Sequence, residues 1–245
     1  MNSTKHNQLA AWLQSATGQN LTRLEKEQLT QLFAHSYSET VVLLGSVAQQ
    51  HLLPSLPAKN SFIADVDFAT ATLERSAYPI FTADPRQLPI MPESVDTVLV
   101  PHTLEQYQHL PQMLRQIYQM MKPQAYFIIM GVDPVNLWGI WRNLSVEMRR
   151  VLPKVYSLSA MCRYLRYAGF AVMEKHHMPL RYAHTENKRA LWRFMPRQLS
   201  ISCRNYVIVA RRNEQIVTPR KLGWKKVTHL AENGFAKPAI KKSHE

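Results

Sequence analysis

The pattern of apolar and polar residues is helical at the start of the chain. Apolar residues recur there at helical spacing, at Leu21, Leu24, Leu32 and Phe33. This spacing predicts an amphipathic helix with one packed face. Thr22, followed three residues later by Glu25, is typical of a capping box, so we expect the helix to begin there, after a separate helix nearer the N-terminus.

From residue 40 onward the pattern changes to short, continuous apolar runs that alternate with amphipathic segments. Such runs are typical of parallel strands that are buried on both faces. They cover residues 40–44, 61–64, 80–83, 95–100, 125–130, 170–173 and 205–210. Helical patterns lie at 110–121 and from the N-cap Ser157 to Gly169. This alternation predicts a doubly wound, mostly parallel α/β sheet with helices on both faces and a late antiparallel hairpin.

A glycine and several acids follow the ends of the first strands. The ends read Gly45-Ser46, then Asp65-Val66-Asp67, then Asp84, and then Pro101-His102. In open α/β sheets a ligand binds at the carboxyl ends of the strands, where the strand order reverses. A glycine lets the backbone approach a nucleoside, and carboxylates accept hydrogen bonds from ribose hydroxyls or an adenine amino group. Each acid taken singly is also explained as a cap of a turn.

Composition is that of a globular protein, with 46% hydrophobic and 19% charged residues among 245. No apolar run approaches the roughly 20 residues of a membrane-spanning helix, and no signal peptide is visible. The two cysteines, Cys162 and Cys203, are too few for a disulfide framework, and the histidines lack metal-ligand spacing. We therefore expect a reduced, cytoplasmic protein without a metal site.

The net charge of +13 is concentrated in the second half of the chain. Residues 1–120 carry 7 Lys and Arg against 10 Asp and Glu, a balance of −3, whereas residues 121–245 carry 23 against 7, a balance of +16. This is either a solvated surface with a basic tail or a basic face that attracts phosphate. Residues 188–197 interleave cations with aromatic residues, a pattern found in proteins that hold single-stranded nucleic acid.

Several motifs resemble a known family. Residues 88–105, LPIMPESVDTVLVPHTLE, resemble the signature around the fourth strand of class I S-adenosylmethionine-dependent methyltransferases, and in particular the methyltransferase-domain-11 group. Residues 114–123 are similar to that group's following helix, which ends in Lys-Pro, and residues 167–170 to its later Ala-Gly-Phe turn. Residues 131–139 resemble a bacterial subgroup with Asn-Pro and Leu-Trp-Gly after the fifth strand.

The resemblance implies a seven-stranded Rossmann-like sheet and methyl transfer from S-adenosylmethionine to an acceptor that the sequence does not identify. It matches Gly45 and Ser46 to the cofactor loop, Asp65 or Asp67 to the ribose-binding acid, and Asp84 to the acid near adenine. Pro101 and His102 then lie where the methyl group is delivered, which makes His102 the candidate general base, with a histidine that is only hydrogen-bonded within its loop as the alternative.

The cofactor loop departs from the family pattern. The family has a Gly-x-Gly-x-Gly-like loop, whereas residues 45–50 read GSVAQQ and contain one glycine. The alternative function is therefore a catalytically inactive protein of the same fold that binds RNA or another acidic partner through its basic half.

The residue pattern and the resemblance together divide the chain. The pattern predicts a helical segment at 1–37 and a basic, flexible tail at 212–245, and the resemblance implies a methyltransferase-like domain at 38–211, with a helical insert near 134–156. Within the insert, Trp138, Trp141 and Arg142 are candidates for acceptor recognition. The insert's apolar stripe with interspersed arginines is also typical of core packing, or of a helix on an anionic membrane surface, so peripheral membrane contact is a further open alternative.

Overall fold

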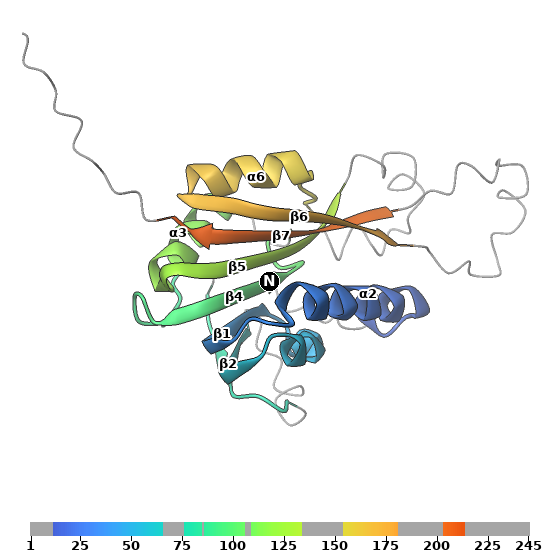
Figure 1. The fold of residues 1–245 in the computed structure, drawn as a ribbon, viewed down its shortest axis with the longest axis horizontal. Coiled ribbons are helices and arrows are strands. Elements are labelled where there is room, and N and C mark those ends of the chain that lie inside the picture. Colours follow the sequence, from blue (N-terminus) through green and yellow to red (C-terminus); the bar gives the residue numbers. More distant parts are fainter. Residues whose placement is uncertain are drawn as a thin grey trace, which may run out of the picture. The chain divides into compact units, whose positions relative to one another are not determined.

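A computed structural model of the protein describes residues 12–65, 76–84, 86–105, 109–133, 154–180 and 203–213. All of these residues lie in the first of the chain's two compact units, Met1–Glu214 and Gln215–Glu245. The strands are β1 (Ser38–Gly45), β2 (Ala58–Asp65), β3 (Ile80–Thr82), β4 (Val95–Pro101), β5 (Met121–Asp133), β6 (Phe170–Leu180) and β7 (Cys203–Arg212). The α-helices are α2 (Ala16–Phe33), α3 (Leu110–Met120) and α6 (Leu158–Tyr167), and η1 (Val47–Ser55) is a 3₁₀-helix (Figure 1).

The strands form one seven-stranded sheet in the order β3-β2-β1-β4-β5-β7-β6. Strands β1 to β5 pair in parallel, and β7 runs antiparallel to both of its neighbours, β5 and β6 (Figure 1). The predicted fold class, a Rossmann-like, mostly parallel sheet with a late antiparallel hairpin, is confirmed.

The sheet has a hydrophobic core on each face, which explains the continuous apolar runs in the sequence. Successive residues of β1 point to opposite faces. Val41 and Leu43 pack in the core that contains residues of α2 and η1. Val42 and Leu44 pack in the core that contains residues of α3 and α6. A strand covered on both sides needs apolar residues on both faces, and the buried residues Val41 to Leu44 of β1 supply them.

Helix α2 begins earlier than the capping-box pattern predicts. Its N-cap is Ser15, whose hydroxyl accepts a hydrogen bond from the backbone N–H of Gly18 at 3.2 Å. Thr22 therefore lies inside the helix, and the prediction that the helix begins at Thr22 is wrong. Glu25 is not a capping residue either, because it is 2% exposed and lies on the buried face, four residues from both Leu21 and Leu29.

Helices α3 and α6 agree with the sequence pattern at their ends. Pro111 occupies the first turn of α3, where its missing N–H costs nothing. Ser157 caps α6 by accepting a hydrogen bond from the N–H of Ala160 at 3.2 Å. Gly169 follows α6 with a φ of +93°, a conformation that L side chains rarely adopt. The helix η1, by contrast, occupies a segment for which the sequence pattern predicts no element.

Candidate functional site

The carboxyl ends of β1 and β2 are side by side. Gly45, the last residue of β1, is in register with Asp65, the last residue of β2, and Asp65 is in register with Thr82 of β3. The strand order reverses between β1 and β4, which makes this edge the expected ligand site of an open α/β sheet. Asp65 is 5% exposed. Of the two acids predicted here, only Asp65 is placed, because Asp67 lies outside the described residues.

The side chain of Gln49 crosses from the end of β1 to the end of β4. Its amide Nε2 donates a hydrogen bond to the carbonyl oxygen of Pro101 at 2.8 Å. Its Oε1 accepts a hydrogen bond from the backbone N–H of Ser46 at 3.1 Å. Gln49 is only 2% exposed, so these two bonds form a buried connection across the switch point of the sheet, which we call the Gln49 bridge.

Close packing around Gly45 leaves no room for a side chain. A Cβ atom on Gly45 would lie 2.5 Å from Oε1 of Gln49 and 3.1 Å from the hydroxyl oxygen of Thr103. That hydroxyl donates to the carbonyl oxygen of Leu44, at 2.9 Å, and lies 3.1 Å from that of Pro101. The glycine is therefore required by the side chains that now occupy this edge of the sheet.

Ser46 forms the turn from β1 into η1. Its hydroxyl accepts a hydrogen bond from the N–H of Ala48 at 3.3 Å, and Gln49 completes a capping box with it. The next residue, Val47, is 4% exposed and packs into the core beside α2. The turn that carries several glycines in the family pattern is thus held here by side-chain caps.

The carboxylate of Asp84 bonds to both the side chain and the backbone of Arg86. It forms an ion pair with Arg86, with 2.6 Å between Oδ2 and Nη2, and its Oδ1 accepts a hydrogen bond from the N–H of Arg86. Hydrogen bonds from the Arg86 side chain lower the pKa of Asp84 below its usual value. These contacts are those of a turn-capping acid, the alternative that the sequence left open.

His102 lies at the centre of a buried cluster of ionisable side chains. Its Nε2 is 2.7 Å from Oε1 of Glu25 on α2, and its Nδ1 is 3.3 Å from Oε2 of Glu105. The other oxygen of Glu105 accepts a hydrogen bond from the N–H of Val132 at 2.7 Å. All three ionisable side chains are no more than 2% exposed. This cluster ties α2, the loop after β4 and the end of β5 together, in a backbone conformation with a φ of +54° at His102.

The cluster keeps His102 protonated. Burial alone would lower the pKa of His102, but the carboxylate of Glu25, together with Glu105, raises it to about 10. Burial raises the pKa of Glu105, while the hydrogen bond from His102 opposes that shift. A general base needs an unprotonated nitrogen that can reach the substrate, and both nitrogens of His102 face carboxylates. The geometry therefore supports a structural role for His102 and not the predicted catalytic one.

Two residues of this site, Glu25 and Glu105, were missed in the sequence analysis. Glu25 could have been recognised from its position, because a carboxylate between Leu21 and Leu29 falls on the apolar stripe of a helix. Gln49 lies in the loop whose departure from the glycine pattern is visible in the sequence, but the sequence does not indicate which backbone groups its side chain bonds to. Glu105 lies within the motif of residues 88–105, but its burial depends on the loop after β4, which the pattern does not define.

Other predicted residues cannot be placed. The described residues do not include Trp138, Trp141 or Arg142. They also leave out most of the insert at 134–156 and nearly all of the tail at 212–245. Among the described residues, no helix has the length and apolar character needed to cross a membrane.

Comparison with known proteins agrees with the resemblance seen in the sequence. The Methyltransferase domain family matches residues 16–129. No curated protein matches the chain in sequence.

Many solved structures share the fold. A protein from Thermotoga maritima, described as a methyltransferase dependent on S-adenosylmethionine and a possible histamine N-methyltransferase, is 15% identical with a TM-score of 0.59, over 80% of this chain and 91% of its own. A second match is a chain from the complex of the Haloferax volcanii Trm112 methyltransferase activator with a methyltransferase. It is 18% identical with a TM-score of 0.59, and the match covers 85% of this chain and 97% of the other. The [4+2]-cyclase SpnF is 14% identical with a TM-score of 0.58, and the match covers 81% of this chain and 83% of the cyclase chain. At these identities the likeness establishes the fold.

Proposed function

We propose that this chain, which has the class I methyltransferase fold and matches the Methyltransferase domain family over residues 16–129, transfers a methyl group from S-adenosylmethionine to an acceptor. The observation that supports the proposal best is the register of Gly45 with Asp65 at the switch point of the sheet. A residue without a side chain thus lies beside a buried carboxylate, the pair that a nucleoside requires once the Gln49 side chain has moved away from Gly45.

The partners of the Gln49 bridge fit the amino-acid end of the cofactor. A backbone N–H at Ser46 suits a carboxylate, and a backbone carbonyl at Pro101 suits an ammonium group. The Gln49 amide offers the same two functions, one acceptor and one donor, between these partners. Binding of the cofactor here therefore requires the Gln49 side chain to rotate out of the site.

The cofactor, when bound, supplies an electrophilic methyl group on a sulfonium, so the chain has to align donor and acceptor and exclude water. Asp65 is assigned to the ribose hydroxyls, and the turn at Gly45 and Ser46, with Pro101, to the methionine part. His102 fixes the position of the loop after β4. Trp138, Trp141 and Arg142 remain the proposed contacts of the acceptor.

Calorimetric titration with S-adenosylmethionine and with its demethylated product tests the proposal. We expect a dissociation constant in the micromolar range, which corresponds to about −8 kcal/mol. Asp65→Ala removes a charge-assisted hydrogen bond and should weaken binding about 10- to 150-fold. Asp96→Ala is the matched control, because Asp96 is at the amino end of β4, where it bonds to Lys122 and Thr40. Absence of binding at millimolar ligand to a folded protein would refute the proposal.

One observation favours a second candidate function. The Gln49 bridge already satisfies both backbone partners at the switch point, which is the arrangement expected of a fold that no longer binds the cofactor. In that case the protein is a catalytically inactive one that binds RNA or another acidic partner through its basic half, and the wild type would not bind the cofactor.

A further inference from the structure

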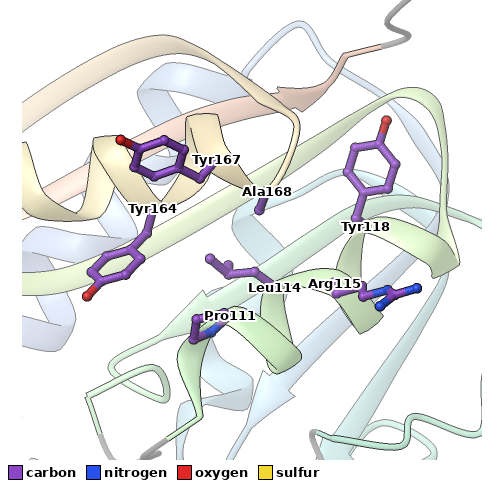
Figure 2. Close-up of a pocket in the computed structure, with 7 residues that line it drawn as sticks. All are labelled: Pro111, Leu114, Arg115, Tyr118, Tyr164, Tyr167 and Ala168. Carbon is purple, nitrogen blue, oxygen red and sulfur yellow. The ribbon is translucent and has the colours of Figure 1, made fainter.

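A groove of about 430 Å³ lies between α3 and α6, and nothing in the proposed function uses it. Its lining includes Pro111, Leu114 and Ala168. The volume is within the range of about 300–1,000 Å³ that is typical of small-molecule sites. Figure 2 shows that the two helices contribute its opposite walls.

Each wall carries a pair of side chains three residues apart, which places them on one face of their helix. Arg115 and Tyr118 come from α3, and Tyr164 and Tyr167 come from α6 (Figure 2). Tyr118 is held in place, because its hydroxyl donates to the carbonyl oxygen of Asn213 at 2.8 Å. Its ring also contacts the guanidinium of Arg212, 4.8 Å from the ring centroid. Tyr167 is 84% exposed, so its ring is available to a ligand.

The charge of the two helices is entirely positive. Neither α3 nor α6 contains an aspartate or a glutamate, whereas they contain Arg115, Arg163 and Arg166. The three arginines are exposed, and none forms an ion pair with a described residue. Of the three, Arg115 lines the groove, while Arg163 and Arg166 add positive charge to the exposed surface of α6, so a ligand with negative charge is favoured here.

We propose that the groove between α3 and α6 binds single-stranded RNA, with a base stacked on Tyr167 and a phosphate held by Arg115. An exposed aromatic ring beside guanidinium groups is the combination that holds single strands without reading their sequence. A membrane surface is a poorer occupant, because the leucine, isoleucine and methionine side chains of both helices are in the core, with Leu158 the only one that is not fully buried. The proposal goes beyond methyl transfer and does not depend on it.

Fluorescence anisotropy with a labelled twelve-nucleotide polyuridine and the full chain tests the proposal. Tyr167→Ala should weaken binding by about 5- to 150-fold, the loss of one stacked base. Tyr37→Ala is the matched control, because Tyr37 is also strongly exposed, at 72%, and lies before β1. Tyr167 has little packing to lose, so the melting temperatures of both variants should stay close to that of the wild type.

Two further measurements separate stacking from charge. Arg115→Ala should reduce the slope of log affinity against log salt by about one, whereas Arg23→Ala, on α2, should leave it unchanged. A strand of the same length with abasic sugars should bind to the wild type more weakly than polyuridine does. The loss of affinity should be about as large as the loss that Tyr167→Ala causes for polyuridine. Equal affinity of the Tyr167 and Tyr37 variants would overturn the proposal. So would equal binding of the abasic strand, or binding to vesicles of anionic lipid without binding to polyuridine.

Discussion

Removal of the Gln49 bridge is the sharpest test of how the switch point works. In Gln49→Ala the amide is lost, and the N–H of Ser46 and the carbonyl of Pro101 become available to a ligand. If cofactor binding must first break these two hydrogen bonds, each worth about 0.5–1.5 kcal/mol, the bridge lowers affinity by about 1–3 kcal/mol. The variant should therefore bind S-adenosylmethionine about 5- to 150-fold more tightly than the wild type.

The assay is calorimetric titration, supported by the thermal shift at a fixed excess of ligand, which grows with affinity. Gln50→Ala is the control, because Gln50 is the same residue type one position along, and its Oε1 accepts a hydrogen bond from Ala77 outside the bridge. Gln49→Met, which keeps the length of the side chain but makes no hydrogen bonds, should bind with intermediate affinity. Equal or weaker binding by a folded Gln49→Ala, relative to Gln50→Ala, would refute the competition between side chain and ligand.

Three other variants test the packing around the site by urea unfolding. His102→Asn keeps a residue that tolerates a positive φ but breaks the cluster, so it should lose about 3–5 kcal/mol at pH 6. Because the pKa of His102 is raised from 6.5 to about 10 in the folded state, this difference should be full below pH 6.5 and should shrink as the pH rises toward 10; a difference independent of pH would contradict the ionised cluster. Gly131→Ala should lose about 1–3 kcal/mol, since its Cβ would lie 2.5 Å from the Tyr206 ring; an unchanged midpoint would contradict that overpacking. Asn205→Leu should gain about 1–3 kcal/mol, because neither side-chain amide atom of Asn205 has a hydrogen-bond partner among the described residues; destabilisation would indicate a partner for this buried amide.

The sheet could be predicted because its signals are local. Residues 41–44 are apolar at every position, which is typical of a strand covered on both faces, as β1 is. The caps of α6 at Ser157 and Gly169 are likewise local features of backbone chemistry. The start of α2 was mispredicted because Thr22 and Glu25 have the spacing of a capping box, whereas Ser15 caps the helix and Glu25 lies on its buried face.

The site was less predictable, because its contacts join residues that are distant in the sequence. Glu25 and His102 are 77 positions apart, and Gln49 and Pro101 are 52 apart. No periodicity links such pairs. The residues that end strands, Gly45 and Asp65, could be found because the topology of a parallel sheet brings strand ends together without any side-chain contact.

The loss of glycines in the loop after β1 is explained by where the replacing side chains go. Val47 enters the core beside α2, and Gln49 enters the space between β1 and β4, while Ser46 and Gln49 cap the turn. Both side chains are buried, so each contributes to the packing at this edge of the sheet. Val47 packs away from the switch point, so of these two side chains Gln49 alone bonds to the backbone groups that the proposed cofactor would use. The departure from the glycine pattern thus reduces, at this edge of the sheet, to one buried side chain whose two hydrogen bonds contribute about 1–3 kcal/mol, which is less than the roughly 8 kcal/mol of the proposed micromolar affinity.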